Sequence, residues 1–128
     1  MLSRELELAI LLVEDEALIR LMVSEELSLA GFQVCEAENG PEAARLIDTP
    51  SAVFGLLITD VHIPGGLDGM HVADLMRARF PEVPIIYTTG RPDVLENFRR
   101  LGPKQTVLPK PFFPSELITL VKQVLHTS

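Results

Sequence analysis

The sequence is poor in cysteine, in basic residues and in long apolar runs, and each shortage excludes a class of protein. A single cysteine, Cys35, cannot form an intramolecular disulfide, which suits a reducing compartment. The net charge of −7 leaves no clustered basic surface of the kind that binds nucleic-acid phosphates. No apolar run is long enough to span a membrane, and Met1 to Glu7 lacks the apolar core of a signal peptide. We therefore expect a cytoplasmic protein that binds neither nucleic acid nor membrane.

Aliphatic residues dominate what is present. The chain has 128 residues, of which 47% are hydrophobic and only 5% aromatic, so we expect one domain, residues 1–128, with an aliphatic core. Short apolar runs alternate with amphipathic stretches along the chain. The apolar runs predict buried strands at Leu8–Val13, Gln33–Ala37, Phe54–Thr59, Pro84–Thr88 and Thr106–Leu108. The amphipathic stretches predict helices at Ala17–Ala30, from a cap at Asn39 to about Thr49, and at Met70–Phe80, Pro92–Leu101 and Ser115–His126.

Strands that alternate with helices through short connections predict an α/β fold. Because right-handed crossovers place helices on both sides, we expect a doubly wound, five-stranded parallel sheet with helices on both faces. Local signals mark several helix ends. Gly31 is a C-terminal stop, and Asn39 with Glu42 forms a capping-box pattern. The core stripe of the first helix is predicted to be Ile19, Met22, Val23, Leu27 and Ala30.

Polar residues that could carry chemistry follow four of the predicted strands. Glu14 and Asp15 follow the first strand, Asp60 the third, Thr89 the fourth and Lys110 the fifth. Taken singly, each has an ordinary explanation as a turn residue, a helix-terminal charge, a strand former or a solvated lysine. In an open parallel sheet, however, the carboxyl ends of the strands share one edge, so all five are expected to meet there.

This combination of side chains suits phosphoryl transfer. Carboxylates that lie close together repel, and at least one has a raised pKa unless a cation intervenes. Mg²⁺ prefers oxygen ligands and could bridge carboxylates and a phosphoryl oxygen. One carboxylate could then attack phosphorus to form an acyl phosphate. Lys110 would offer a point charge to the phosphoryl oxygens.

Four segments carry a resemblance to a known family. They are Leu11-Leu12-Val13-Glu14-Asp15-Glu16, Leu57-Ile58-Thr59-Asp60-Val61-His62-Ile63-Pro64, Tyr87-Thr88-Thr89-Gly90 and Leu108-Pro109-Lys110-Pro111-Phe112. In this order and spacing, the chain resembles a receiver domain of two-component response regulators over essentially its whole length. The resemblance implies a flavodoxin-like strand order, 2-1-3-4-5. It also implies a response regulator that stands alone in a phosphorelay, although a piece of a hybrid kinase is an alternative.

The resemblance assigns roles at the site. Asp60 would be the phosphoacceptor, Asp15 would bind Mg²⁺ directly and Glu14 through water, and the backbone carbonyl of His62 would be a further ligand. The phosphoryl donor would be a phosphohistidine on a sensor histidine kinase or a histidine phosphotransfer protein. The chain would remove its own phosphoryl group but would not be an enzyme that turns over an external substrate.

The same resemblance predicts how the signal leaves the site. Thr89 would hydrogen-bond the phosphoryl group and move inward on activation, and Lys110 would pair with the phosphate, positioned by a cis bond to Pro111. The output would be a contact with a downstream protein that the sequence does not identify. The face around the fourth helix, fifth strand and fifth helix is the family's usual output surface, and a homodimer there is left open.

Several positions depart from the family pattern. The loop Gly65–Gly69 is one residue longer than the commonest form, Val107 stands where many receivers carry an aromatic switch residue, and Phe113 replaces a polar cap before Pro114. His62 and Arg91 lie where they could flank the phosphoryl group. The first helix also has a second apolar row, which predicts either flanking burial or a docking face for a histidine-bearing helix: Leu18, Leu21 and Leu29.

Three other functions compete with this interpretation. A flavin-binding carrier of this topology would need a phosphate-cradling loop after the first strand, where Glu14-Asp15-Glu16 would repel phosphate. A metal-dependent phosphatase with an aspartyl phosphate usually has its nucleophile after the first strand, not the third. The main alternative is a pseudo-receiver, a protein-interaction module that acts without phosphorylation.

Overall fold

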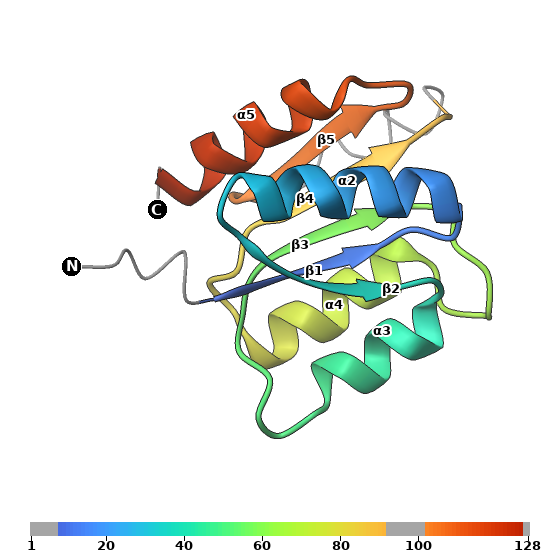
Figure 1. The fold of residues 1–128 in the computed structure, drawn as a ribbon. Coiled ribbons are helices and arrows are strands. Elements are labelled where there is room, and N and C mark those ends of the chain that lie inside the picture. Colours follow the sequence, from blue (N-terminus) through green and yellow to red (C-terminus); the bar gives the residue numbers. More distant parts are fainter. Residues whose placement is uncertain (1–7, 92–101, 127–128) are drawn as a thin grey trace.

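The computed structural model describes residues 8–91 and 102–126, and Figure 1 shows one sheet between two layers of helices. Five parallel strands are arranged in the order β2-β1-β3-β4-β5. The strands are β1 (Ala9–Val13), β2 (Gln33–Ala37), β3 (Phe54–Asp60), β4 (Ile85–Thr89) and β5 (Gln105–Pro109). The helices are α2 (Ala17–Leu29), α3 (Gly40–Ile47), α4 (Gly69–Arg79) and α5 (Pro114–His126). The predicted strands and four of the predicted helices are therefore confirmed, with ends that differ by one or two residues, and the predicted helix Pro92–Leu101 lies outside the described residues.

The sheet is buried on both faces, which explains the continuous apolar runs of its central strands. Leu11 and Val13 of β1 pack into the core on the side of α3 and α4, whereas Ile10 and Leu12 pack toward α2 and α5. Figure 1 shows the same division, with α2 and α5 on one side of the sheet and α3 and α4 on the other. Among the described helices, none is both long enough and apolar enough to cross a membrane.

The local signals at helix ends are only partly confirmed. Asn39 caps α3, because its Oδ1 accepts a hydrogen bond from the Glu42 backbone N–H at 2.8 Å. The reciprocal half of the predicted capping box is shifted by one residue, since the Glu42 carboxylate accepts from the N–H of Glu38 at 2.9 Å rather than from the cap residue. Gly31 follows α2 with a φ of 97°, a left-handed conformation that glycine adopts without steric cost.

The loop between β3 and α4 packs against neighbouring backbone at two glycines. A Cβ added to Gly40 would lie 2.1 Å from the backbone oxygen of Leu67, and a Cβ on Gly69 would lie 2.1 Å from that of Asp60. The Gly40 N–H also donates to the Pro64 oxygen at 3.4 Å. The loop therefore packs closely against the start of α3.

Two predictions about apolar residues are wrong. Met22 is 47% exposed, so the core stripe of α2 consists of the buried Val23 and Leu27 with their partly buried neighbours. Flanking burial of the second apolar row also fails, because these side chains are exposed at 83%, 61% and 75%: Leu18, Leu21 and Leu29. The second row and Met22 form one exposed apolar face of α2.

Candidate functional site

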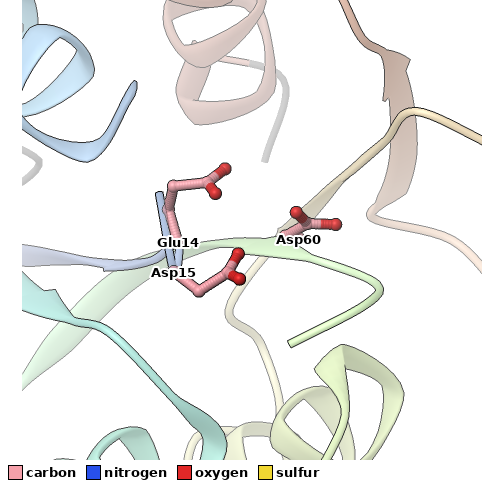
Figure 2. A group of neighbouring side chains, drawn as sticks. All are labelled: Glu14, Asp15 and Asp60. Atoms are coloured by element: carbon pink, nitrogen blue, oxygen red, sulfur yellow. The ribbon is translucent and has the colours of Figure 1, made fainter. Parts of the chain in front are cut away.

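Carboxylates from two strands meet at the carboxyl edge of the sheet. Glu14 and Asp15 directly follow β1, and Asp60 is the last residue of the neighbouring strand β3. Figure 2 shows the three side chains gathered at the ends of these strands. One oxygen from each carboxylate lies within 4.8 Å of the others. Glu14 and Asp60 are buried, with 3% and 8% of their surface exposed, whereas Asp15 is exposed.

Lys110 brings a positive charge from β5 to the same place. Its Nζ donates a hydrogen bond to Glu14 Oε1 at 2.7 Å and another to Asp60 Oδ2 at 2.8 Å. Its backbone N–H donates to the Thr89 carbonyl at 2.7 Å, which ties the residue to the end of β4. The bond between Lys110 and Pro111 is cis, as the sequence predicted. Residues far apart in the chain therefore meet at one point because parallel strands end at one edge.

Burial and charge act on the site in opposite directions. Burial raises the pKa of Glu14 above its usual value, and the hydrogen bonds from Lys110 and from the Glu16 backbone only partly offset this effect. Burial alone would lower the pKa of Lys110, but the hydrogen bonds to Asp60 and Glu14 and the negative charges of both outweigh it, so this pKa is raised. The ammonium group accordingly stays charged at neutral pH.

Backbone amides fix the orientation of two of the carboxylates. The His62 N–H donates to Asp60 Oδ1 at 3.1 Å, and the Glu16 N–H donates to Glu14 Oε2 at 3.0 Å. Asp60 therefore uses one oxygen for the backbone and turns the other, Oδ2, toward Lys110. The His62 side chain is exposed.

Thr89 lies at the end of β4 and is fully buried. Its hydroxyl accepts a hydrogen bond from the backbone N–H of Arg91 at 3.0 Å, so it stabilises the chain that leaves the strand. Val107 lies opposite Tyr87 in the register of β4 and β5. Tyr87 lies within β4, inside the predicted strand Pro84–Thr88; it is buried and donates its hydroxyl hydrogen to Gln105 Oε1 at 2.9 Å.

The donor set fits a hard divalent cation. Each of the three carboxylates can offer an oxygen within a few ångströms of the others. Oxygen ligands of this kind are those that Mg²⁺ prefers. Burial makes the charged form of Glu14 less favourable and raises its pKa, and Lys110 only partly offsets this cost. A second cation would relieve this cost, so the residues present suit Mg²⁺.

Sequence reasoning missed Arg20. Its Nη1 donates a hydrogen bond to the backbone oxygen of Glu14 at 2.8 Å, and its side chain is only 17% exposed. The sequence does hold a signal for it: Arg20 is a basic residue next to the apolar stripe of α2, one helical turn after Glu14-Asp15-Glu16.

Comparisons with known proteins agree with this geometry. A family model described as the response regulator receiver domain matches residues 10–122. The response regulator MprA of Mycolicibacterium vanbaalenii is 35% identical over 120 residues, and the probable transcriptional regulator ycf27 of Cyanidium caldarium is 37% identical over 119. A solved receiver protein from Sinorhizobium medicae matches with a TM-score of 0.85 and 33% identity, covering 94% of this chain and 95% of that one. The chain belongs to the response regulator receiver family.

Further similarity comes from the receiver domain of the hybrid histidine kinase CckA, with a TM-score of 0.76 and 32% identity over 91% of this chain and 98% of that chain. The two curated relatives are covered differently: each alignment spans 91% of this chain but only 46% of ycf27 and 50% of MprA. This receiver domain thus spans about half the length of these relatives. Receivers act in two-component signalling, where they interact with histidine kinases or phosphotransfer proteins and generally bind Mg²⁺ through acidic residues.

Proposed function

We propose that this receiver accepts a phosphoryl group on Asp60 from a phosphohistidine donor, with Mg²⁺ bound by Glu14, Asp15, Asp60 and the His62 carbonyl. The observation that supports this most is the position of Lys110, whose ammonium lies between two buried carboxylates while a third lies beside them. A structural ion pair would need only one carboxylate, whereas three acidic groups around one cation leave an excess of negative charge that suits a metal.

Each residue of the site has its own role in the phosphoryl transfer. Asp60 Oδ2 attacks phosphorus, the P–N bond to the donor imidazole breaks, and the imidazole leaves with the bonding electron pair and takes a proton. The His62 N–H holds the other oxygen of Asp60 in place. Lys110, whose raised pKa keeps it charged, pairs with a phosphoryl oxygen. When bound, Mg²⁺ supplies positive charge to the carboxylates and the phosphoryl oxygens.

We also propose how the signal leaves the site and how it ends. The Thr89 hydroxyl gives up its bond with the Arg91 N–H and donates instead to the phosphoryl group, which changes the chain after β4. That change would alter the contact with a downstream protein. The receiver would hydrolyse its own acyl phosphate and would not turn over an external substrate.

The exposed apolar face of α2 is the surface that we assign to the phosphohistidine donor. It begins at Leu18, just after the acidic turn Glu14-Asp15-Glu16, and continues through Leu21, Met22 and Leu29. Phe113, soon after Lys110 in the chain, is another exposed apolar side chain, with 74% of its surface exposed. Its backbone N–H donates to Glu116 Oε1 at 2.8 Å, which is the half of a capping box that does not need a polar side chain at Phe113. An apolar helical surface that begins next to Glu14 and Asp15 in the chain would suit a helical partner.

Mass spectrometry after treatment with a small phosphodonor and Mg²⁺ tests the proposal. The wild-type chain is expected to gain the mass of one phosphoryl group, and chelation of Mg²⁺ should abolish the gain. Asp60→Asn should take up none, whereas Asp74→Asn, which changes an exposed carboxylate on α4, should behave as wild type. Uptake by Asp60→Asn would contradict the assignment of the phosphoacceptor. No uptake by the wild type, from either a small donor or a kinase, would instead support the pseudo-receiver.

A further inference from the structure

The backbone of the acidic turn is held from outside the site by one arginine. Arg20 lies on α2, one turn after Glu16, whose carbonyl accepts the Arg20 backbone N–H at 2.9 Å. Its guanidinium reaches back so that Nη1 donates to the carbonyl oxygen of Glu14 at 2.8 Å. The Glu14 backbone N–H donates to the Ala37 oxygen at 3.0 Å. Both backbone polar groups of Glu14 are therefore fixed, one by β2 and the other by Arg20.

Two acidic residues hold the guanidinium on its other side. Glu36 Oε1 lies 3.4 Å from Arg20 Nε, and Glu38 Oε2 lies 3.8 Å from Nη2. Glu36 also accepts a hydrogen bond from the Ser24 hydroxyl at 3.0 Å, which joins it to α2. The guanidinium thus connects the ends of β1 and β2 to the first turns of α2. A planar fork of donors can meet several acceptors at once, which a lysine ammonium on a flexible stem does less well.

We propose that Arg20 is a positioning residue for the metal site: by holding the Glu14 carbonyl, it aims the Glu14 and Asp15 carboxylates at the cation. This inference rests on the proposed function, because it concerns the affinity of the same site for Mg²⁺. The guanidinium of Arg20 contacts the Glu14 carbonyl and the carboxylates of Glu36 and Glu38, so Arg20 is not itself a proposed metal ligand. Its effect passes through the backbone of the ligand residues, in the way that partners of metal ligands tune affinity in other sites.

The sign of the expected effect separates positioning from charge. Removing a positive charge makes an acidic protein more negative, and this alone would bind a divalent cation more tightly. Loss of positioning has the opposite effect, since the carboxylates would have to be ordered by the metal itself. A weaker affinity for Mg²⁺ after the loss of Arg20 therefore cannot come from the change in net charge.

The test uses three variants of the same chain. Arg20→Met removes the donors and the charge, and Arg20→Lys keeps the charge without the fork. Arg77→Met makes the same change of charge on α4, where Arg77 pairs with exposed Asp74 at 3.6 Å. Mg²⁺ alone is titrated into each protein without phosphodonor and followed by calorimetry. We expect the dissociation constant to rise about tenfold for Arg20→Met, by an intermediate factor for Arg20→Lys and not at all for Arg77→Met.

A second readout distinguishes positioning from a general loss of structure. The rate of phosphorylation by a small donor is measured against Mg²⁺ concentration. For Arg20→Met, the half-saturating concentration should rise by the same factor as the dissociation constant, while the rate at saturating Mg²⁺ stays within about twofold of wild type. If Arg20→Met does not fold, Arg20→Lys carries the test alone. This variant leaves the net charge unchanged, so any weaker Mg²⁺ binding comes from the loss of the planar fork of donors.

Equal or tighter Mg²⁺ binding by the Arg20 variants would overturn the inference, and so would a lower saturated rate with an unchanged half-saturating concentration. If the wild type binds Mg²⁺ and is phosphorylated while Arg20→Met matches it, only the role of Arg20 fails. If the wild type neither binds Mg²⁺ nor takes up a phosphoryl group, the proposed function fails as well.

Discussion

Replacing Lys110 with methionine removes the ammonium from between two buried carboxylates while keeping a side chain of similar length. The ammonium donates at 2.7 Å to Glu14 and at 2.8 Å to Asp60. The side chains of Lys110, Glu14 and Asp60 are 15%, 4% and 10% exposed. Removing one partner of a buried ion pair typically costs about 3–5 kcal/mol, because the other charge is left uncompensated. Since protonation of Glu14 can relieve part of this repulsion, we expect the free energy of unfolding to fall by about 3 kcal/mol at neutral pH without Mg²⁺.

The loss of stability in Lys110→Met is expected to depend on pH. In the wild type the pKa of Lys110 is raised, so its stabilising effect is fully present below the unfolded value near 10.5 and is lost as the pH rises through the folded pKa. At the acidic end, Glu14 is protonated as the pH falls through its raised pKa, and the stranded carboxylates of the variant are then less costly. The difference between wild type and Lys110→Met should therefore be largest near neutral pH and smaller at both ends.

Mg²⁺ provides the second arm of the experiment. Because the cation would replace the missing ammonium, Mg²⁺ should raise the free energy of unfolding more for Lys110→Met than for the wild type, although the variant should accept a phosphoryl group more slowly. Urea denaturation followed by circular dichroism, with chelator or with Mg²⁺, measures both effects.

Lys104→Met is the matched control for Lys110→Met. It removes the same charge from an exposed pair with Glu82, and such pairs contribute about 0–1 kcal/mol. The reasoning would be refuted if Lys110→Met without Mg²⁺ were as stable as the control, or if Mg²⁺ stabilised wild type and variant equally.

Three further predictions concern other parts of the molecule. Tyr87 is the single tyrosine and the chain has no tryptophan, so ultraviolet absorbance can follow the titration of one phenol. Because burial raises the pKa of Tyr87 to about 12, the midpoint should lie there in the folded protein and near 10 in urea. Equal midpoints in the two conditions would contradict this. Gly40→Ala should lower the free energy of unfolding by about 1–3 kcal/mol in urea denaturation, because its Cβ would overlap the backbone oxygen of Leu67. Gly90→Ala, whose Cβ would meet open space, should lower it little. Similar losses for both variants would show that the close approach at Gly40 is unimportant. Leu21→Glu should slow phosphoryl transfer from a protein donor but not from a small donor. Leu75→Glu, which changes an exposed leucine on α4, should slow neither reaction. A loss with both donors for Leu21→Glu would argue against docking on α2.

The sequence predicted the strands well because both faces of the sheet are covered. Residues Leu56 to Ile58 are apolar without alternation, which is typical of a strand buried on both sides, and the structure confirms it. The first helix was harder, because its apolar residues extend around most of its circumference. Periodicity then cannot separate core from surface, and Met22 was wrongly placed in the core.

The gathering of the candidate site was predictable for a topological reason. Glu14, Asp15 and Lys110 follow strands and Asp60 ends one, and parallel strands bring their carboxyl ends to one edge. The resemblance to receivers then assigned a role to each residue, and those roles stay predictions. The position of Thr89 was predicted in the same way, but its hydrogen bond with the backbone of Arg91 was not.

The sequence by itself determined the parallel α/β sheet, the edge at which its acidic residues lie and the family to which it belongs, because these follow from hydrophobic periodicity, chain order and short motifs. Only the tertiary structure decided that the Lys110 ammonium bridges Glu14 and Asp60, that the apolar face of α2 stays exposed, and that Arg20 holds the backbone of the acidic turn. These features depend on distances between side chains from different elements, and no local pattern in the chain encodes a distance of that kind.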